Sequence, residues 1–167
     1  FPMSAPFHLS CPMPAFHFDT INLGHGSGGL LSQQLLDSGV FDVLKNDLLN
    51  ERHDGATFHL PGKLAFSTDS FVVSPLFFPG GNIGALAVNG TVNDLAMCGA
   101  LPKYLSLAFI LEEGLPMQTF WEVLQSIKAA CHAAGVQVIT GDTKVVERGK
   151  GDQLFINTTG LGVVHEQ

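Results

Sequence analysis

Charged side chains are scarce in this chain of 167 residues, where 14% are Asp, Glu, Lys or Arg and 46% are apolar. The basic ones number only 8, and the net charge of −7 argues against a surface that neutralises nucleic-acid phosphates. Disorder is also excluded, because it requires low hydrophobicity and high charge. So few charges on so apolar a chain indicate that another subunit or domain covers part of the apolar surface.

Long hydrophobic runs are missing as well. The run from Leu105 to Leu111 is far shorter than the roughly 20 residues that a membrane-spanning helix needs, so we predict no contact with a membrane. Cysteine is rare, and Cys11, Cys98 and Cys131 lack the spacing of a metal site. We expect free, mostly buried thiols and a cytoplasmic protein.

The first 20 residues differ in composition from the rest. Four prolines in this segment interrupt regular structure, and no basic region followed by an apolar one marks a signal peptide. We therefore predict a loosely ordered arm over residues 1–20 and one domain over residues 21–167. No internal repeat is evident.

Apolar spacing predicts the order helix, strand, helix, strand, helix, strand, strand. The first helix is expected to be capped by Ser27 and to run through Val40. The later elements are expected at 63–73, 82–98, 104–112, 116–135, 136–140 and 154–164, with a stiff loop over 75–81. The helix over 82–98 is rich in Gly and Ala, so a neighbour should pack very close to it. A mixed sheet with helices on one face is the simplest packing, which is an α+β fold.

The segment from Gly24 to Gly29 matches the dinucleotide pattern G-x-G-x-x-G letter for letter. A Rossmann site also needs a preceding buried strand and a later acidic strand end, and neither is evident here. We favour a glycine-rich cover for phosphates, whose amides and helix start attract an anion. A merely flexible turn is the alternative, and His25 either reaches a phosphate or only decorates the loop.

Several common catalytic signatures are absent from the sequence. No G-x-x-x-x-G-K-[ST] stretch, protein-kinase motif or Ser-His-Asp arrangement with an elbow occurs. The histidines other than His25 show no zinc spacing and are interpreted as structural. If a nucleotide binds, its site is not a P-loop.

Isolated aspartates next to small residues are the main candidates for chemistry. Mg²⁺ prefers oxygen ligands and usually takes one or two carboxylates, with water and phosphate completing its shell. Each acid also has a plain structural interpretation: a solvated strand end for Asp69, an internal hydrogen bond for Asp94, and a turn for Asp54 and Asp142. Lys144 is either a phosphate contact or a surface charge.

Several segments together resemble one known family. They are His25–Gly29, Phe66–Ser70, Phe77–Gly84, Asn93–Asp94, Ile110–Pro116 and Thr140–Val146. In this order they are similar to the HypE family of hydrogenase maturation factors, within the PurM-like superfamily of ATP-binding proteins related to aminoimidazole ribonucleotide synthetase. The resemblance runs from about Ile21 to Val164.

The resemblance implies a PurM amino-terminal-like mixed sheet, with two subunits pairing their sheets into a barrel and ATP at the interface of this homodimer. It implies an ATP-dependent carbamoyl dehydratase, which converts an S-carboxamide on the family's carboxy-terminal cysteine to a thiocyanate. That group supplies the cyanide ligands of NiFe hydrogenase, with HypF as carbamoyl donor and HypC–HypD as acceptor.

The resemblance also assigns roles to residues of this sequence. Lys144 and His25 become candidates for catalysis, and Asp54, Asp69, Asp94 and Asp142 for Mg²⁺. The ATP-binding candidates are Gly26, Ser27, Gly28, Gly29, Asp69, Asn93, Asp94, Gly141, Asp142, Thr143 and Lys144.

Two features of the family are missing between residues 1 and 167: the second domain and the terminal cysteine. We therefore expect the ATP-binding half of such an enzyme, inactive by itself. The alternatives are a non-catalytic dimerisation or docking module for other maturation factors, and another PurM-like ATP-dependent enzyme.

Overall fold

The computed structural model of the chain describes residues 13, 14 and 18–165. Most of the predicted arm, including Cys11, lies outside these residues. The last residues of that segment contact the domain: Thr20 forms a β-bridge with Pro116, and the amide of Met117 donates to the carbonyl of Asp19.

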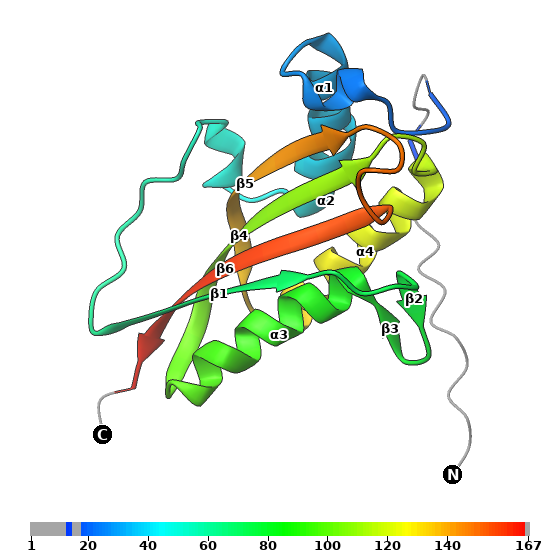
Figure 1. The fold of residues 1–167 in the computed structure, drawn as a ribbon. Coiled ribbons are helices and arrows are strands. Elements are labelled where there is room, and N and C mark those ends of the chain that lie inside the picture. Colours follow the sequence, from blue (N-terminus) through cyan, green and yellow to red (C-terminus); the bar gives the residue numbers. More distant parts are fainter. Residues whose placement is uncertain (1–12, 15–17, 166–167) are drawn as a thin grey trace.

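A mixed four-stranded sheet forms the centre of the domain, in the order β1-β6-β4-β5 (Figure 1). Its strands are β1 (Leu64–Phe71), β4 (Ala100–Glu112), β5 (Gln137–Val146) and β6 (Leu154–Val164). The β4 and β5 strands are parallel, whereas β6 is antiparallel to both β1 and β4. The predicted α+β fold with a mixed sheet is therefore confirmed, and β1 and β5 are its two edges.

Two long helices cover one face of the sheet. Helix α3 (Ile83–Met97) contacts β1, β6 and β4, and helix α4 (Met117–Ala134) packs against α3 and lies behind the sheet in Figure 1. A Cβ atom on Gly84 would lie 2.6 Å from the carbonyl oxygen of Val123, so only glycine permits this helix contact. This close packing confirms the interpretation of the small residues in α3.

A third helical region lies at the β5 edge. It comprises α1 (Leu30–Leu35), the π-helix η2 (Leu36–Phe41) and α2 (Asp42–Leu44), between the 3-10 helices η1 (Leu23–Gly26) and η3 (Leu49–Glu51). The expected cap at Ser27 is wrong: Gly29 is the N-cap, and the Ser27 hydroxyl donates to the Gly24 carbonyl at 3.0 Å. The hydroxyl therefore bonds within the turn of η1 instead of capping α1.

Other differences from the expected elements concern strands. The expected loop over 75–81 contains a short hairpin of β2 (Phe77–Phe78) and β3 (Gly81–Asn82). Strand β4 begins four residues earlier than expected, and β5 continues through Gly141–Asp142 instead of ending before it. Pairing with a neighbouring strand overrides the local turn tendency of Gly and Asp in β5.

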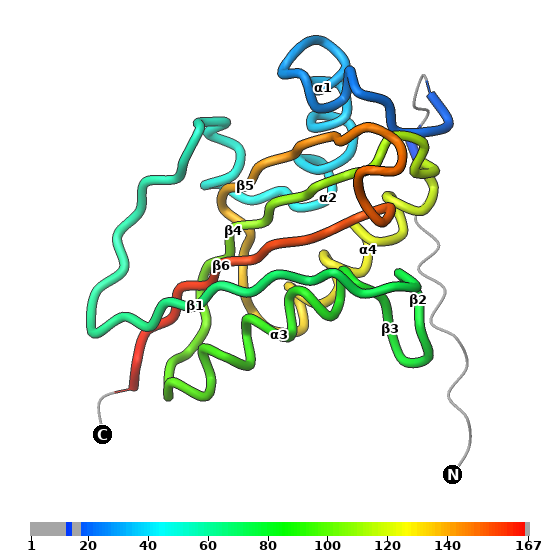
Figure 2. Tube along the Cα trace, viewed as in Figure 1, coloured from blue at the N-terminus to red at the C-terminus, as the bar shows by residue number. Residues whose placement is uncertain are grey.

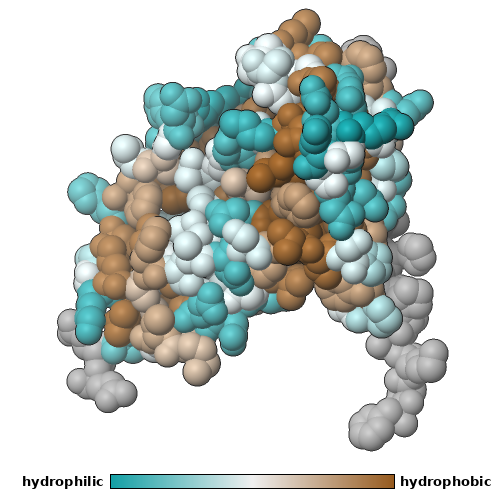
Figure 3. Space-filling model, in the orientation of Figure 1, coloured by the Kyte–Doolittle hydropathy of each residue, from teal (hydrophilic) through white to brown (hydrophobic). Residues whose placement is uncertain are grey.

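The face of the sheet opposite the helices has no helix packed on it within the described residues. Its exposed apolar side chains include Leu64, Phe66 and Leu101 at 45%, 67% and 45% exposure, and Ile110 at 43%. Figure 3 shows apolar surface on the viewed side of the molecule, interrupted by polar patches. This open face accounts for part of the apolar excess of the composition.

Candidate functional site

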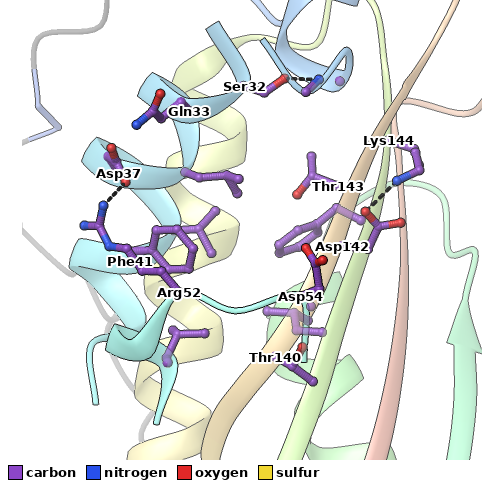
Figure 4. Close-up of a pocket in the computed structure, with 18 of the residues that line it drawn as sticks. Ser32, Gln33, Asp37, Phe41, Arg52, Asp54, Thr140, Asp142, Thr143 and Lys144 are labelled. Carbon is purple, nitrogen blue, oxygen red and sulfur yellow. Dashed lines mark hydrogen bonds and ion pairs between the residues drawn. The ribbon is translucent and has the colours of Figure 1, made fainter. Parts of the chain in front are cut away.

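A cavity of about 700 Å³ lies between the third helical region and strand β5 (Figure 4). Side chains and backbone from the glycine loop, the π-helix, the segment after η3, and strands β4 and β5 form its walls. The lining residues are His25, Gly26, Gly28, Ser32, Gln33, Leu36, Asp37, Val40, Phe41, Leu49, Arg52, His53, Asp54, Leu107, Phe109, Val138, Thr140, Gly141, Asp142, Thr143 and Lys144. Segments more than 100 residues apart in the sequence thus meet in one concave site.

The glycine loop packs directly on β5. A Cβ atom on Gly26 would lie 2.5 Å from the backbone nitrogen of Val145, so only glycine allows the loop to approach the strand. No side chain caps the following helix at Gly29, which leaves its first amides available to an anion. The Gly28 amide is already bonded to the Ser32 hydroxyl at 3.0 Å.

His25 fixes the shape of this loop. The imidazole Nδ1 accepts the backbone N–H of Asn22 at 3.0 Å, while the Asn22 side chain accepts the N–H of Gly24 at 3.0 Å. The ring is 5% exposed and meets Phe18 edge to face at 5.7 Å. Burial lowers the pKa of His25, with the Asn22 hydrogen bond as a smaller opposing effect, so the neutral ring carries its proton on Nε2.

Strand β5 supplies the charged side of the cavity. A Cβ atom on Gly141 would lie 2.1 Å from the Leu107 carbonyl oxygen, so β4 and β5 pair closely here only because residue 141 is glycine. The residues expected in a loop therefore lie on a rigid strand. Asp142 and Lys144 project from the same side of it.

These two side chains form an ion pair. The Lys144 ammonium lies 2.5 Å from Asp142 Oδ1, with 62% and 57% of the respective side chains exposed. The hydrogen bond from Lys144 lowers the pKa of Asp142, assisted by the N–H of Thr143 and opposed by slight burial. The carboxylate is thus ionised at neutral pH and available to a cation.

Asp54 lines the same cavity and lies just below Asp142 in Figure 4. In the sequence, the Asp-Gly-Ala context of Asp54 is equally typical of a turn, so the cavity is what favours a role for this residue in binding. His53, interpreted as structural, also lines the cavity. Asp37 and Arg52 are further lining residues that the sequence did not suggest, because no local motif marks them.

Away from Lys144 the lining is largely apolar, apart from the Asp37–Arg52 ion pair beside Phe41. The apolar lining residues are Leu36, Val40, Phe41, Leu49, Leu107, Phe109 and Val138. One cavity therefore joins a polar end, near the glycine loop and Lys144, to an apolar end.

Asp69, Asn93 and Asp94 lie elsewhere, at the β1 edge. Asp94 Oδ2 accepts the Ser67 hydroxyl at 2.9 Å, and Asp69 Oδ1 accepts the N–H of Ser70 at 2.7 Å. Asp69 lies two residues before the end of β1, close to the strand end at which it was expected. Strands β6 and β4 separate this edge from β5, so this chain alone does not bring the two groups together. Their role in ATP binding stays a prediction.

The oxygen ligands of the cavity are few but are of the kind that Mg²⁺ prefers. Across the described residues, no three His, Cys, Asp or Glu side chains lie close enough to hold a metal. Asp54 and Asp142 in one cavity supply two carboxylates, which fits a Mg²⁺ ion completed by phosphate oxygens and water.

The described cysteines do not contribute to the cavity. Cys98 and Cys131 are free, as expected. Cys131 is buried, which raises its thiol pKa to about 12. The expectation of a buried thiol is wrong for Cys98, which is exposed just after the end of α3.

Comparison with known families identifies the domain type. The family described as AIR synthase related protein, N-terminal domain, matches residues 52–164.

Within the described residues, no helix combines the length and apolar character needed to cross a membrane.

Curated relatives are similar over most of this chain. Carbamoyl dehydratase HypE of Azotobacter vinelandii is 54% identical over 146 residues, which cover 87% of this chain and 43% of that protein. Carbamoyl dehydratase HypE of Escherichia coli (strain K12) is 53% identical over 152 residues, covering 87% of this chain and 45% of that protein. The chain thus spans less than half the length of these relatives.

Solved structures are similar as well. The crystal structure of hydrogenase maturation protein HypE in complex with ATP has a TM-score of 0.85 and 51% identity, covering 86% of this chain and 43% of that chain. The crystal structure of a HypE–HypF complex has a TM-score of 0.62 and 46% identity, covering 83% of this chain and 43% of that chain.

Proposed function

Because the chain belongs to the family of AIR synthase related proteins, as their N-terminal domain, we propose that it is the ATP-binding part of a HypE-like carbamoyl dehydratase. The observation that carries this proposal is the packing of the glycine loop on β5, which places Gly26, Gly28 and His25 around the same cavity as Asp142 and Lys144. The similarity to a HypE structure in complex with ATP supports the choice of nucleotide.

The two ends of the cavity suggest how ATP lies in it. The triphosphate would occupy the polar end, where amides at the start of α1 and the Lys144 ammonium attract negative charge. The adenine would occupy the apolar end beside Phe41 and Val138, where an aromatic base buries apolar surface. Asp54 and Asp142 would hold Mg²⁺ together with phosphate oxygens.

The reaction needs ATP because an amide oxygen is a poor leaving group. Phosphorylation of the carboxamide oxygen releases ADP and one N–H proton and gives an O-phosphorylated imidate. Departure of the phosphate together with the second N–H proton then leaves the nitrile of a thiocyanate. Lys144 would stabilise charge on the transferred phosphoryl group. His25 would donate from Nε2, since its Nδ1 is occupied by the Asn22 amide.

The open face of the sheet supports a homodimer. Exposed Leu64, Phe66, Leu101 and Ile110 suit a second copy packing its own sheet on this face. Asp69 and Asp94 lie at the edge distant from the cavity, so a second copy is also the means by which they would reach bound ATP. The sheets of two subunits would then close into a barrel.

The partners follow from the same family. A HypE–HypF complex is among the similar structures, which supports HypF as a partner of the protein that contains this chain. HypC–HypD would receive the cyanide. Use of ATP and the free thiols at Cys98 and Cys131 support a cytoplasmic location.

Calorimetry with Mg-ATP and sedimentation test this proposal directly. We expect saturable binding by a dimer, weakened in Lys144→Ala but not in Lys150→Ala, whose residue lies outside the cavity. A dimer that binds no Mg-ATP would instead support the second candidate, a docking module for other maturation factors. In a longer protein containing this chain, Lys144→Ala should reduce turnover more than ATP binding.

A further inference from the structure

Arg52, one of the lining residues of the cavity, is held by two side-chain contacts and has an unusual backbone conformation. Its guanidinium lies 2.7 Å from Asp37 Oδ1 and 5.2 Å from the centre of the Phe41 ring. Its backbone has φ 54° and ψ 44°, a left-handed conformation that a non-glycine residue adopts only when its surroundings impose it. Asp37 and Phe41 are four residues apart in the π-helix η2, so one helical face receives the arginine.

The segment that follows Arg52 has few other attachments. Residues 52–63 form no helix or strand, and Figure 2 shows them leaving the β5 side to reach β1 at the opposite edge. Phe58 contacts the Tyr104 ring at 4.8 Å, and the Lys63 carbonyl accepts the Val164 amide at 2.8 Å. Both contacts lie well after Asp54.

Asp54 makes no hydrogen bond or ion pair within the described part of the chain. Its place beside the cavity therefore depends on the backbone turn two residues before it. That turn is held by the hydrogen bond from the Arg52 amide to the Leu49 carbonyl at 3.3 Å and by the ion pair and ring contact of the Arg52 side chain. Figure 4 shows this side chain on the opposite wall from Asp142.

We propose that Arg52, clamped by Asp37 and Phe41, is a positioning residue that holds Asp54 toward Asp142 for a divalent cation bound with the nucleotide. This inference rests on the proposed Mg-ATP site and adds to it a residue that positions one of the metal ligands. The direct alternative is that Arg52 itself binds a phosphate, which would require the ion pair with Asp37 to open.

Binding of ATP with Mg²⁺ and with EDTA separates these roles. Arg52→Asn removes the cation while Asn tolerates left-handed backbone, and Asp37→Asn removes the partner while leaving Arg52 in place. Each should weaken ATP binding about two- to five-fold with Mg²⁺, as expected for a partly exposed ion pair, and leave binding in EDTA unchanged. The double variant should match the single ones, because both remove the same contact.

One further measurement makes the test independent of the nucleotide. Hydrogen exchange of the amides at 50–52, which bond to the carbonyls of Asn46, Leu48 and Leu49, should be faster in both variants of the free protein. Asp42→Asn, an exposed acid on the neighbouring turn outside the cavity, is the matched control and should change neither exchange nor binding.

The outcomes also separate this inference from the proposed function. Wild-type protein that binds no ATP, or binds it equally with and without Mg²⁺, overturns the metal–nucleotide site and this inference with it. Mg²⁺-dependent binding in the wild type with unchanged exchange and affinity in Asp37→Asn overturns only the role of Arg52. An equal loss with Mg²⁺ and EDTA in Arg52→Asn assigns the residue to phosphate instead.

Discussion

The β5 edge and the β1 edge of the sheet both carry aspartates, but the surroundings of these aspartates differ. At β5, Asp142 and Lys144 are more than half exposed and face a cavity, and Asp54 has no partner in the described structure. At β1, Asp94 accepts a hydroxyl from Ser67 and Asp69 accepts an amide from Ser70. The comparison teaches that acids in similar sequence contexts become candidates for one metal site only where the fold places them around the same cavity, as it does for Asp54 and Asp142.

The two edges also differ in what a side chain added at a glycine would meet. Gly141 faces the backbone carbonyl of Leu107 across paired strands, whereas Gly90 of α3 faces the far end of the Phe71 ring at 2.9 Å. Backbone in a sheet cannot move away from an added methyl group, but a ring can turn.

The largest effect is therefore expected from Gly141→Ala. Its Cβ would lie 2.1 Å from the Leu107 oxygen, so we expect a loss of about 3 kcal/mol or more in the free energy of unfolding. Gly90→Ala should stay within about 1 kcal/mol, because Ala favours the helix and offsets the ring contact. Denaturant titration of both variants measures the difference, and equal losses would contradict the distinction between the edges.

Asp142→Asn should have the next largest effect, on Mg-ATP binding. Loss of one charge-assisted contact is worth about 1.5–3 kcal/mol, or roughly 10- to 150-fold in affinity. Asp69→Asn and Asp94→Asn should weaken binding only where the protein is dimeric. Calorimetry above and below the dimer dissociation constant tests this, and an effect of Asp94→Asn on a monomer would contradict the separation of the edges.

Ser67→Ala should have a smaller effect, on stability. It removes the 2.9 Å hydrogen bond that satisfies Asp94, which should cost about 1 kcal/mol. Ser106→Ala on β4 is the matched control, because Ser106 makes no side-chain hydrogen bond in the described structure. Equal stability of the two variants in thermal unfolding would show that Asp94 does not depend on Ser67.

The smallest effect is expected from pH at the glycine loop. Because burial lowers the pKa of His25 below 6.5, the unfolded chain takes up this proton more readily than the folded one. The contribution of His25 to stability is complete above pH 6.5 and is lost as pH falls toward its folded pKa. His25→Asn, whose Oδ1 lies close to the position of the imidazole Nδ1 and can still accept the Asn22 amide, should remove that part of the pH dependence, and an unchanged profile would contradict it.

Much of this organisation could be predicted from the sequence. The order of helices and strands follows from apolar spacing, and the tight contact of α3 with α4 follows from its small residues. Asp54, Asp142 and Lys144 were candidates from their immediate neighbours. The resemblance to the HypE family then agreed with the family match over residues 52–164.

Other features had no local signal. Gly and Asp are common in turns, so Gly141 and Asp142 are expected in a loop. Pairing with β4 instead keeps both residues inside strand β5. Ser27 had the chemistry of a cap, yet its hydroxyl bonds back to Gly24. Asp37 and Arg52 lie 15 positions apart with no motif, and only the turn after η3 brings them together.

The sequence by itself determined the elements and the kinds of chemistry available, because spacing of apolar residues and the choice of Gly, Asp and Lys act over a few neighbouring positions. Tertiary structure decided which acids share a cavity and which are satisfied internally. That choice depends on strand order, since β6 and β4 lie between the two edges. The order of strands is set by packing across the whole chain, which no short segment encodes.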